Sequence, residues 1–386
     1  MVGKINYNIQ KHIRNEMHSI LNPVYTLRAL TETPLLKILK QRNYMNNYIS
    51  TLMLLSGIIV GSTSPQASMT SIPQNSFTYV FHKGLRMVNY SSNFSLTPTG
   101  KALSGWGLSL MLGDTQTYQR QQLTLKSRFQ AGVFSPDDSL MLIGLSDATV
   151  RLVDTYKIVE LKIFPGHLFT GNQGFDVLLV GFSSDGKMVL TGSLPNEVRL
   201  WDTHTGEMKK VIKVKDHTIE SVAFGRNPKT NEELLLTGLS KGKSILWDIK
   251  TGEQRGSLRP YHTDRKSTPV IALALSPDGN TAVTVQGDEA IARLWNINTG
   301  KIIHGIKGHK APILCVTYSP DGKTVLTGSK DKTARLWDAE TGKELAVLDP
   351  TRKGHIGLVS TVQFTSNGDI FTGLTDGVVI LWKRQE

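Results

Sequence analysis

Short alternating runs of apolar and polar residues recur from about residue 76 to the end of the chain. A typical run is LCVTY, which ends at the large apolar residue Tyr318. Alternation with a period of two and one apolar face predicts a β-strand. Most runs are followed by a turn sequence such as SPDG at 319–322, in which Pro, Asp and Gly favour turn dihedral angles. The pattern therefore predicts an all-β chain of many short strands.

These strands are grouped into units of similar length. The third predicted strand of successive units ends at Val153, Trp201, Trp247, Trp295, Trp337 and Trp382, which are 42 to 48 residues apart. A Thr-Gly pair follows in four units and opens a tight turn into a fourth strand, because Gly adopts positive φ at little cost. Four antiparallel strands in roughly 45 residues are typical of one blade of a β-propeller.

The recurring phrase W-D-x-x-T-G and the Gly-His pairs at 166–167, 308–309 and 354–355 resemble the WD-repeat propeller family. The stretch TARLWDAETGKEL at 333–345 is similar to bacterial members in particular. The resemblance covers about 76–386 and implies a seven-bladed β-propeller, with six clear repeats and one degenerate repeat that begins near residue 94. Six or eight blades are the alternatives. Because the last unit lacks its own fourth strand, residues 76–81 are expected to supply it and remove an open edge.

In that family a His, a Ser or Thr, an Asp and the Trp of one repeat form a hydrogen-bond network that fixes the blade, since buried polar groups need partners. The resemblance places two complete sets in this chain: His309, Thr327, Asp331 and Trp337, and His355, Thr372, Asp376 and Trp382. Pro195, Lys241 and Glu289 stand at the Asp position of other units. We therefore expect blades near the C-terminus to be more rigid than those before residue 260.

The same residue types do not predict catalysis. A His-Asp-Thr set that recurs at one blade position indicates structure, whereas a catalytic triad occurs once and is recognised by its geometry. No P-loop, G-x-G-x-x-G or H-E-x-x-H motif is present. A single cysteine, Cys315, excludes an intramolecular disulfide and a cysteine zinc cluster. The sequence therefore predicts a protein that is not an enzyme and that uses no cofactor or metal.

The leading functional hypothesis is a non-enzymatic protein–protein interaction scaffold, because loops held on a rigid frame commonly carry recognition. In the family, partners meet the top face, which includes the loops between second and third strands. The corresponding candidate partner-binding residues are Ser146, Asn196, Lys241, Asp288, Lys330, Lys332 and Thr375. Each is also the kind of residue found in an ordinary solvated loop. One alternative is an exported ligand-binding or enzymatic propeller that uses its central channel.

Net charge suggests a further alternative. The chain carries +12 at pH 7, and arginines at 151, 199, 293 and 335 recur two residues before the unit ends. Such an array would attract nucleic acid or a membrane surface. Scattered amphipathic arginines that cover apolar surface are the simpler interpretation, and no nucleic-acid partner is expected.

Residues 1–75 differ from the repeats and are interpreted as an N-terminal extension. They contribute +5 to the net charge and contain the apolar run 49–60, followed by a Ser/Thr/Pro-rich linker at 62–75. Twelve residues are fewer than the roughly 20 of a membrane span but suit a signal-peptide core. The run predicts an exported, periplasmic or membrane-associated protein, with cleavage near 62–67 or a start at Met45. A cytoplasmic location, with 49–60 as a buried strand or helix, is the alternative.

Overall fold

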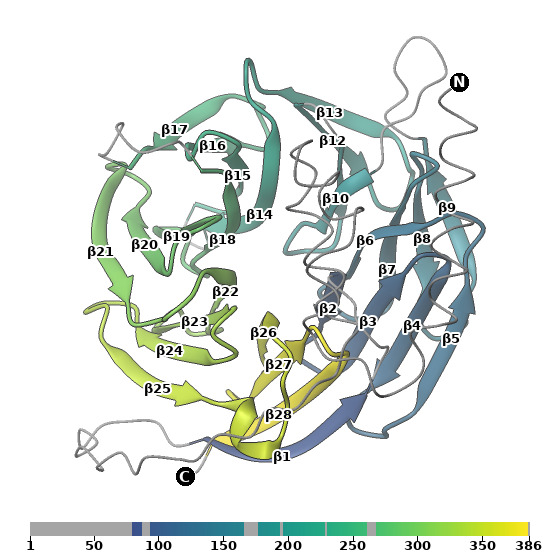
Figure 1. The fold of residues 1–386 in the computed structure, drawn as a ribbon. Helices are drawn as coiled ribbons and strands as arrows, with labels where there is room; N and C mark the ends of the chain where they lie inside the picture. The colour runs from purple at the N-terminus through teal and green to yellow at the C-terminus, as the bar shows by residue number, and fades with distance from the viewer. Residues whose placement is uncertain are drawn as a thin grey trace, which may run out of the picture. The chain divides into compact units, whose positions relative to one another are not determined.

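Seven four-stranded antiparallel sheets make up the part of the chain that the computed structural model describes, which is residues 79–86, 93–165, 177–193, 196–227, 230–260 and 268–384. The sheets follow one another around a ring as the blades of a β-propeller (Figure 1). Within the described ranges the only helical element is the short 3-10 helix η2 (Pro350–Lys353), which precedes the last blade. The predicted all-β, seven-bladed propeller is confirmed.

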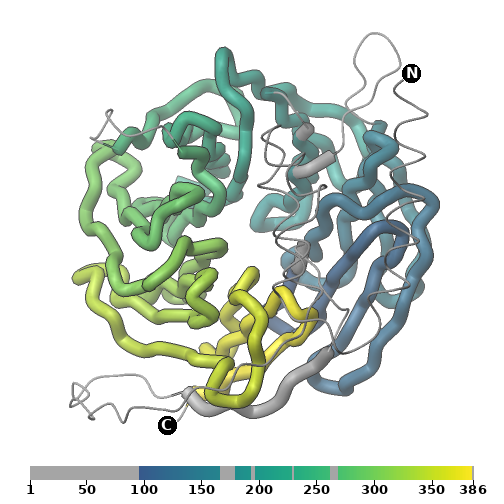
Figure 2. Tube along the Cα trace, viewed as in Figure 1, coloured from purple at the N-terminus to yellow at the C-terminus, as the bar shows by residue number. Residues whose placement is uncertain are grey.

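Blades 1 to 3 follow in chain order along the tube in Figure 2. Blade 1 consists of β2 (Asn93–Leu96), β3 (Lys101–Trp106), β4 (Ser109–Asp114) and β5 (Arg120–Thr124). Blade 2 consists of β6 (Phe129–Phe134), β7 (Leu140–Leu145), β8 (Val150–Asp154) and β9 (Glu160–Phe164). Blade 3 consists of β10 (Val177–Phe182), β11 (Met188–Ser193), β12 (Glu197–Asp202) and β13 (Met208–Lys213). Blade 1 is the degenerate repeat that the sequence predicted near residue 94.

Blades 4 to 6 repeat the same order of strands. Blade 4 consists of β14 (Ile219–Asn227), β15 (Glu232–Leu239), β16 (Ser244–Asp248) and β17 (Gln254–Leu258). Blade 5 consists of β18 (Val270–Leu275), β19 (Thr281–Gln286), β20 (Ile291–Asn296) and β21 (Lys301–Lys307). Blade 6 consists of β22 (Ile313–Tyr318), β23 (Thr324–Ser329), β24 (Ala334–Asp338) and β25 (Glu344–Leu348).

Blade 7 joins the two ends of the propeller. Its strands β26 (Val359–Phe364), β27 (Ile370–Leu374) and β28 (Val378–Arg384) come from the C-terminal end, and β1 (Tyr79–Arg86) pairs antiparallel with β28 as the fourth strand. The expectation that the segment ahead of the first repeat closes the ring is confirmed. The strand lies a few residues later than the expected 76–81. Pairing β1 with β28 satisfies the edge of β28 and fixes the ring closed.

The turns between first and second strands show how the sequence sets local structure. In blade 6 the Ser319 hydroxyl donates to the Asp321 carboxylate over 2.6 Å and accepts from the Thr324 nitrogen over 2.9 Å. Gly322 has φ 71°, a value that glycine tolerates best. The turns after β6, β10 and β18 use Ser135, Ser183 and Ser276 in the same way. The recurring SPDG-like sequence therefore encodes one turn geometry.

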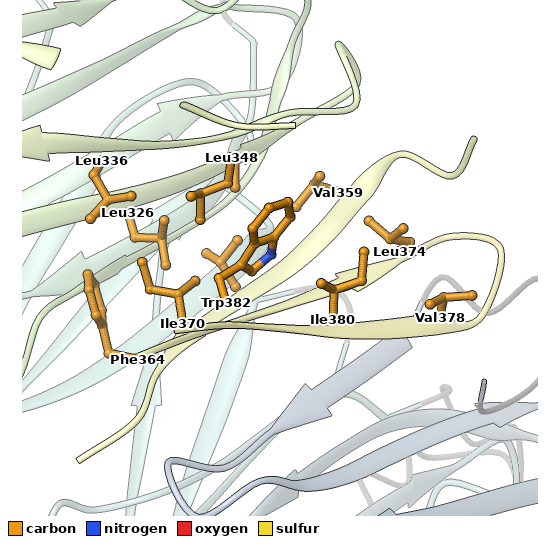
Figure 3. Close-up of a cluster of buried hydrophobic side chains, with 12 residues drawn as sticks. Leu326, Leu336, Leu348, Val359, Phe364, Ile370, Leu374, Val378, Ile380 and Trp382 are labelled. Atoms are coloured by element: carbon orange, nitrogen blue, oxygen red, sulfur yellow. The ribbon is translucent and has the colours of Figure 1, made fainter. Parts of the chain in front are cut away.

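The hydrophobic core lies between neighbouring blades rather than inside any one of them. One cluster combines Leu326, Leu336 and Leu348 of blade 6 with residues of blade 7 that include Val359 and Trp382 (Figure 3). Each fully buried Leu or Val side chain contributes about 1.5–3 kcal/mol. Because a single blade leaves both faces uncovered, each blade needs its neighbours in order to be stable.

Blades approach each other closely where a glycine follows the threonine of the second strand. A Cβ atom on Gly328 would lie 2.6 Å from Cys315 Sγ and 2.6 Å from Val359 Cγ1. No real Cβ atom is that close to a neighbour, so only glycine lets β23 of blade 6 lie against β26 of blade 7. The Thr-Gly pair inside the second strand is thus a packing requirement.

Candidate functional site

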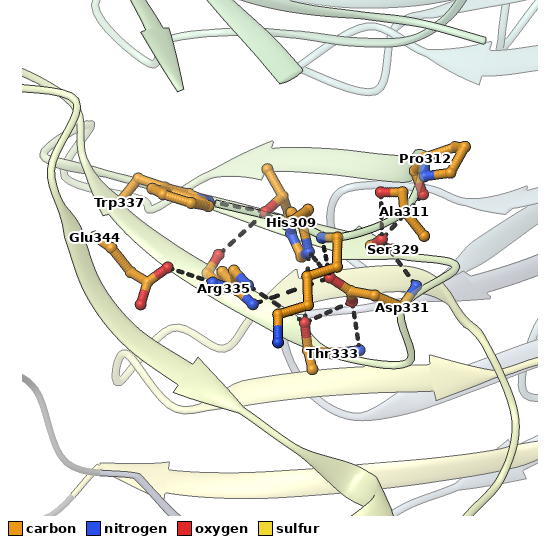
Figure 4. Close-up of polar contacts among 11 residues, drawn as sticks. His309, Ala311, Pro312, Ser329, Asp331, Thr333, Arg335, Trp337 and Glu344 are labelled. Atoms are coloured by element: carbon orange, nitrogen blue, oxygen red, sulfur yellow. Dashed lines mark hydrogen bonds and ion pairs between the residues drawn. The ribbon is translucent and has the colours of Figure 1, made fainter. Parts of the chain in front are cut away.

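The most complete polar network links the loop that enters blade 6 to the loop between β23 and β24 (Figure 4). His309 Nδ1 lies 2.8 Å from Asp331 Oδ2, and His309 Nε2 lies 2.7 Å from Thr327 Oγ1. Trp337 Nε1 donates to the same Thr327 hydroxyl over 2.8 Å. The structure thus brings together all four residues of this set, and the His309 side chain is completely buried.

Asp331 receives further donors from its own loop and from the entry loop. Its carboxylate accepts hydrogen bonds from the Lys310 nitrogen over 2.9 Å, from the Thr333 nitrogen over 2.9 Å and from the Thr333 hydroxyl over 2.6 Å. The Asp331 nitrogen donates to Ser329 Oγ, which in turn donates to the Ala311 and Pro312 carbonyls. Sequence reasoning missed Thr333 and Ser329. The sequence SKDKT at 329–333, in which a Ser and a Thr flank Asp331, could have indicated both residues.

The protonation states of the network follow from its environment. Burial lowers the pKa of His309, and the Asp331 carboxylate only partly opposes this, so the imidazole is neutral near pH 7. Burial alone would raise the pKa of Asp331, but hydrogen bonds from Thr333, Lys310 and His309 outweigh it and hold the pKa at about 2. A neutral His309 beside a carboxylate carries its proton on Nδ1, which leaves Nε2 to accept from Thr327.

The Trp-to-Thr hydrogen bond recurs in five blades. The Trp Nε1 to Thr Oγ1 distances are 2.8 Å for Trp201–Thr191, 3.0 Å for Trp247–Thr237, 2.8 Å for Trp295–Thr284, 2.8 Å for Trp337–Thr327 and 3.0 Å for Trp382–Thr372. A set of groups repeated at the same blade position fits a structural role better than a single reactive centre.

Blade 7 uses its set differently from blade 6. Asp376 Oδ2 accepts a hydrogen bond from the Gly357 nitrogen over 3.3 Å, and Oδ1 accepts one from Val378 over 3.3 Å. A Cβ on Gly357 would lie 2.8 Å from Asp376 Cγ. His355 follows η2 and is half-buried. Its backbone nitrogen donates a hydrogen bond to the Pro350 carbonyl. The Asp376 carboxylate therefore holds the backbone of the loop that enters this blade.

The three sequence departures have different outcomes. Glu289 in blade 5 forms an ion pair with Arg293, with Oε2 2.5 Å from Nη1. Lys241 in blade 4 is exposed. His217, the histidine of the same blade, has a buried Nδ1 atom that makes no hydrogen bond to any described part of the chain. Pro195, like His167 of the same unit, lies outside the described residues.

The seven predicted partner-binding residues all lie between the second and third strands of their blades. They therefore share one face of the ring, because the blades repeat one topology. Lys241, Asp288 and Lys330 are exposed, whereas Ser146, Asn196, Lys332 and Thr375 are half-buried. The Ser146 and Thr375 hydroxyls accept from backbone nitrogens across the loop, and the Asn196 amide donates to the Val214 carbonyl. These three side chains hold the loops in place.

The repeated arginines do not form an array of unpaired charge. The shortest ion-pair distances are 2.8 Å for Arg151–Glu160, 2.6 Å for Arg199–Glu197, 2.5 Å for Arg293–Glu289 and 2.6 Å for Arg335–Glu344. Each pair lies within one blade. Sequence reasoning missed these carboxylates, although Glu160 and Glu344 each follow their arginine by nine residues.

Two features of the described ranges bear on metal and thiol chemistry. Those ranges contain no group of three or more His, Cys, Asp or Glu that could hold a metal ion. Burial raises the pKa of the Cys315 thiol to about 12, which keeps it protonated at neutral pH.

The fold and the recurring Trp–Thr hydrogen bond define the class: a seven-bladed β-propeller whose repeats are similar to WD repeats. Residues 159–202, 300–338 and 343–383 match the family model "WD domain, G-beta repeat". The matches begin in or next to the fourth strand of one blade, at β9, β21 and β25, and end at the third strand of the next blade. Each sequence repeat thus spans two blades, which explains why a strand from the other end must complete the ring.

Several eukaryotic proteins share part of this sequence. Angio-associated migratory cell protein of Homo sapiens is 30% identical over 234 residues, covering 56% of this chain and 51% of that protein. Serine-threonine kinase receptor-associated protein of Gallus gallus is 31% identical over 211 residues, covering 54% and 55%. U3 small nucleolar RNA-associated protein 15 homolog of Xenopus laevis is 24% identical over 273 residues, covering 69% and 49%. The chain spans about half the length of these relatives.

The relatives correct the expected location. They come from eukaryotes, and their names include nucleolar-RNA-associated and nuclear distribution proteins. The prediction of a periplasmic, exported or membrane-associated protein is therefore wrong, and the likeness to bacterial members is not supported. The run 49–60 lies outside the described residues, and its hydrophobicity alone did not specify a destination. No helix in the described part of the chain is long and apolar enough to cross a membrane.

Proposed function

We propose that this chain is a protein-interaction scaffold that presents the loops between second and third strands to protein partners. The observation that carries the proposal is the placement of Lys241, Asp288 and Lys330, which are exposed on one face of a closed ring. A frame whose loops are fixed by buried networks loses little conformational freedom on binding. In blade 6 the network of His309 and Asp331 fixes such a loop.

The named relatives support this proposal. One is named for its association with a serine-threonine kinase receptor and another for its association with a small nucleolar RNA. For the present chain we propose protein partners in general. The paired arginines favour protein over nucleic acid, because their charge is already balanced within each blade.

Affinity capture from native cells tests the proposal with two matched triple variants. The first, Lys241→Ala with Asp288→Ala and Lys330→Ala, changes three exposed residues of the proposed face. The control, Lys157→Ala with Lys250→Ala and Glu340→Ala, removes the same charges from exposed turns between third and fourth strands, on the opposite face. Wild type and the control should retain the same partners, and the first variant should lose them. Equal retention by both variants, or no partner on the wild type, contradicts the proposal.

A further inference from the structure

The hairpin that joins the second and third strands of blade 1 exposes a tryptophan. Trp106, the last residue of β3, has 65% of its surface exposed, and Leu108 in the turn that follows has 50%. Trp106 is the only exposed member of the chain's six tryptophans, all of which lie in described ranges. The last residue of the second strand is buried in blades 2, 4, 5, 6 and 7, where it is Leu145, Leu239, Gln286, Ser329 and Leu374. Blade 1 therefore presents a large apolar side chain on the proposed interaction face.

The polar network that fixes the corresponding loop of blade 6 is absent from blade 1. Gly113 precedes the final aspartate, where other blades have tryptophan. The hydroxyl of Ser104, at the position of the paired threonine, is buried and makes no hydrogen bond to any described residue. The loop has only two residues, Gly107 and Leu108, whereas four residues separate β23 from β24. This loop therefore has no counterpart of Asp331.

Backbone hydrogen bonds hold the tip of the hairpin instead. The Gly107 carbonyl accepts from the Phe129 nitrogen, and the Leu108 carbonyl accepts from the Leu125 nitrogen, both over 2.7 Å. The Phe129 ring is buried against Gly105, which leaves no room for a Cβ atom there. Both carbonyls of the turn are thus tied to the segment 125–129, which connects blade 1 to blade 2. A tip fixed in this way loses little conformational freedom when a partner binds.

The segment that holds the tip also carries two exposed cations, Lys126 and Arg128. Neither forms an ion pair within the part of the chain that the structure describes. The neighbouring carboxylate is Asp147, which accepts from the Ser127 hydroxyl over 2.7 Å and lies 3.5 Å from the Arg151 guanidinium. The apolar tip is therefore bordered by positive charge that no described carboxylate balances.

We infer that this tip binds a segment of a protein partner in which an apolar side chain stands next to an aspartate or glutamate. Below, Trp106, Leu108, Lys126 and Arg128 are called the blade 1 hairpin site. An aromatic or large aliphatic side chain of the segment packs on Trp106 and Leu108, and the carboxylate meets the two cations. Tryptophan and arginine are enriched among the residues that dominate protein interfaces. The inference rests on the proposed scaffold function, for which it specifies the chemistry of the partner.

The composition of the site favours a peptide over a nucleic acid. Sites for single-stranded nucleic acid stack successive bases on several aromatic side chains along a cationic groove. Here one aromatic side chain stands beside the aliphatic Leu108, and the nearby Arg151 is already ion-paired with Glu160. Two cations beside one apolar tip match the length of a short peptide segment.

Selection from a phage-displayed library of random dodecapeptides tests the site on the full-length chain. Peptides enriched on the wild type should combine an aromatic or large aliphatic residue with Asp or Glu within about three positions, a span of roughly 10 Å in an extended chain. Enrichment of peptides without this combination, or no enrichment, contradicts the inference.

Fluorescence anisotropy with the labelled enriched peptide then measures variants at about 0.15 M salt. Trp106→Ala should weaken binding about thirtyfold, as expected for an anchoring interface residue. The double variant Lys126→Glu with Arg128→Glu should weaken binding about tenfold, because charges at the border of an interface assist association. Its loss should shrink as the salt concentration is raised.

Matched controls lie on the opposite face, in turns between third and fourth strands. Tyr156→Ala removes an aromatic side chain that is 71% exposed, and it is the control for Trp106→Ala. Lys157→Glu with Lys250→Glu makes the same charge change as the double variant, at two other exposed lysines. Both controls should bind the enriched peptide within about twofold of wild type.

Two further measurements separate lost contacts from a folding defect. Because Trp106 is exposed, Trp106→Ala should change the thermal midpoint by less than about 2 °C, and Trp106→Phe should recover most of the affinity. Iodide quenches accessible tryptophan fluorescence, so in the wild type it should act mainly on Trp106. Saturating peptide should protect this fluorescence, and undiminished quenching would show that the peptide binds elsewhere.

Other results also overturn the inference. They are equal losses in Trp106→Ala and Tyr156→Ala, tighter binding of a single-stranded RNA or of anionic vesicles through Trp106, or self-association of the wild type that Trp106→Ala abolishes. If no such peptide is enriched while capture still retains partners that depend on Lys241, Asp288 and Lys330, the hairpin site is wrong and the scaffold function stands. If the peptide binds through Trp106 and the wild type captures no partner, the hairpin site stands and the scaffold function fails.

Discussion

The imidazole of His309 and the carboxylate of Asp331 form a 2.8 Å hydrogen bond that ties the entry loop of blade 6 to the loop between β23 and β24 (Figure 4). Both side chains are almost fully buried, with 0% and 8% of their surfaces exposed. This bond joins two loops that are 22 residues apart in sequence. It therefore restrains the face of the propeller that we propose as the interaction surface.

Asp331→Ala should destabilise the protein strongly. It removes the acceptor of four hydrogen bonds, which come from His309 Nδ1, the Lys310 backbone nitrogen, and the backbone nitrogen and hydroxyl of Thr333. Leaving buried donors without their charged acceptor lowers the free energy of unfolding by about 3 kcal/mol. Asp288→Ala, in the corresponding loop of blade 5, changes an exposed carboxylate and should cost less than about 0.5 kcal/mol. Urea denaturation measures both, and similar losses would contradict the role of Asp331.

Stability should fall as the pH is lowered from 7. The folded-state pKa of His309 lies below 6.5 and that of Asp331 is about 2, below 3.8. The unfolded chain therefore binds more protons, and stability falls below pH 6.5 for His309 and between about 4 and 2 for Asp331.

Urea denaturation at about pH 7.5 and about pH 5.5 isolates the His309 contribution, which is up to about 1 kcal/mol per pH unit. The loss of stability between these pH values should shrink in His309→Asn. It should persist in His204→Asn, which changes an exposed histidine. A loss that is the same in both variants would assign the pH dependence to other groups.

Gly328→Ala should destabilise the packing of blade 6 against blade 7. The added methyl group would overlap Cys315 Sγ and Val359 Cγ1, both at 2.6 Å. Overpacking of this kind costs about 1–3 kcal/mol. Gly305→Ala on the outer strand β21, where the nearest atom would be 3.9 Å away, serves as the control and should be nearly neutral. Thermal unfolding of both variants checks the prediction, which fails if Gly328→Ala melts like wild type.

Removing the closing strand should open the ring. A chain that lacks residues 1–87 loses β1 and exposes the edge of β28. An unpaired edge strand promotes association, so this variant should melt at lower temperature and elute partly as oligomers in size-exclusion chromatography. A chain that lacks residues 1–75 keeps β1 and should match wild type in both measurements. This control also tests the proposed boundary between the N-terminal extension and the propeller.

Blade 6 should open less often than blade 4. In blade 6 the histidine has both partners, whereas in blade 4 the His217 Nδ1 atom has none in the described ranges. Amide hydrogen exchange reports such local opening. Amides of β23 should exchange more slowly than those of β15, and the reverse order would contradict the expectation that the early blades are less rigid.

The repeat structure could be predicted because each strand carries its own signal. Alternation marks the buried face, SPDG-like segments mark the turns, and Trp337 and its counterparts mark the third strand. The sequence also indicated which residues could share a network in blade 6. These features depend on residues close together in the chain or on a pattern repeated at constant spacing. The location inferred from residues 49–60 failed because an apolar run specifies burial in some apolar environment but not which one.

Relationships between distant residues were decided only by the tertiary structure. The sequence itself determined strand periodicity, the six clear repeats and the tryptophans that end the third strands of five of them, whereas the structure decided between six, seven and eight blades. Folding decided that β1 (Tyr79–Arg86) pairs with β28. It also decided that each repeated arginine forms an ion pair with a carboxylate of its own blade. The close packing of Val359 against Gly328, which leaves no room for a Cβ atom, is likewise a result of the tertiary structure. It also decided that His217 has no carboxylate to meet. The physical reason is that pairing and charge balance depend on which side chains share a volume, and strands far apart in sequence fill that volume together.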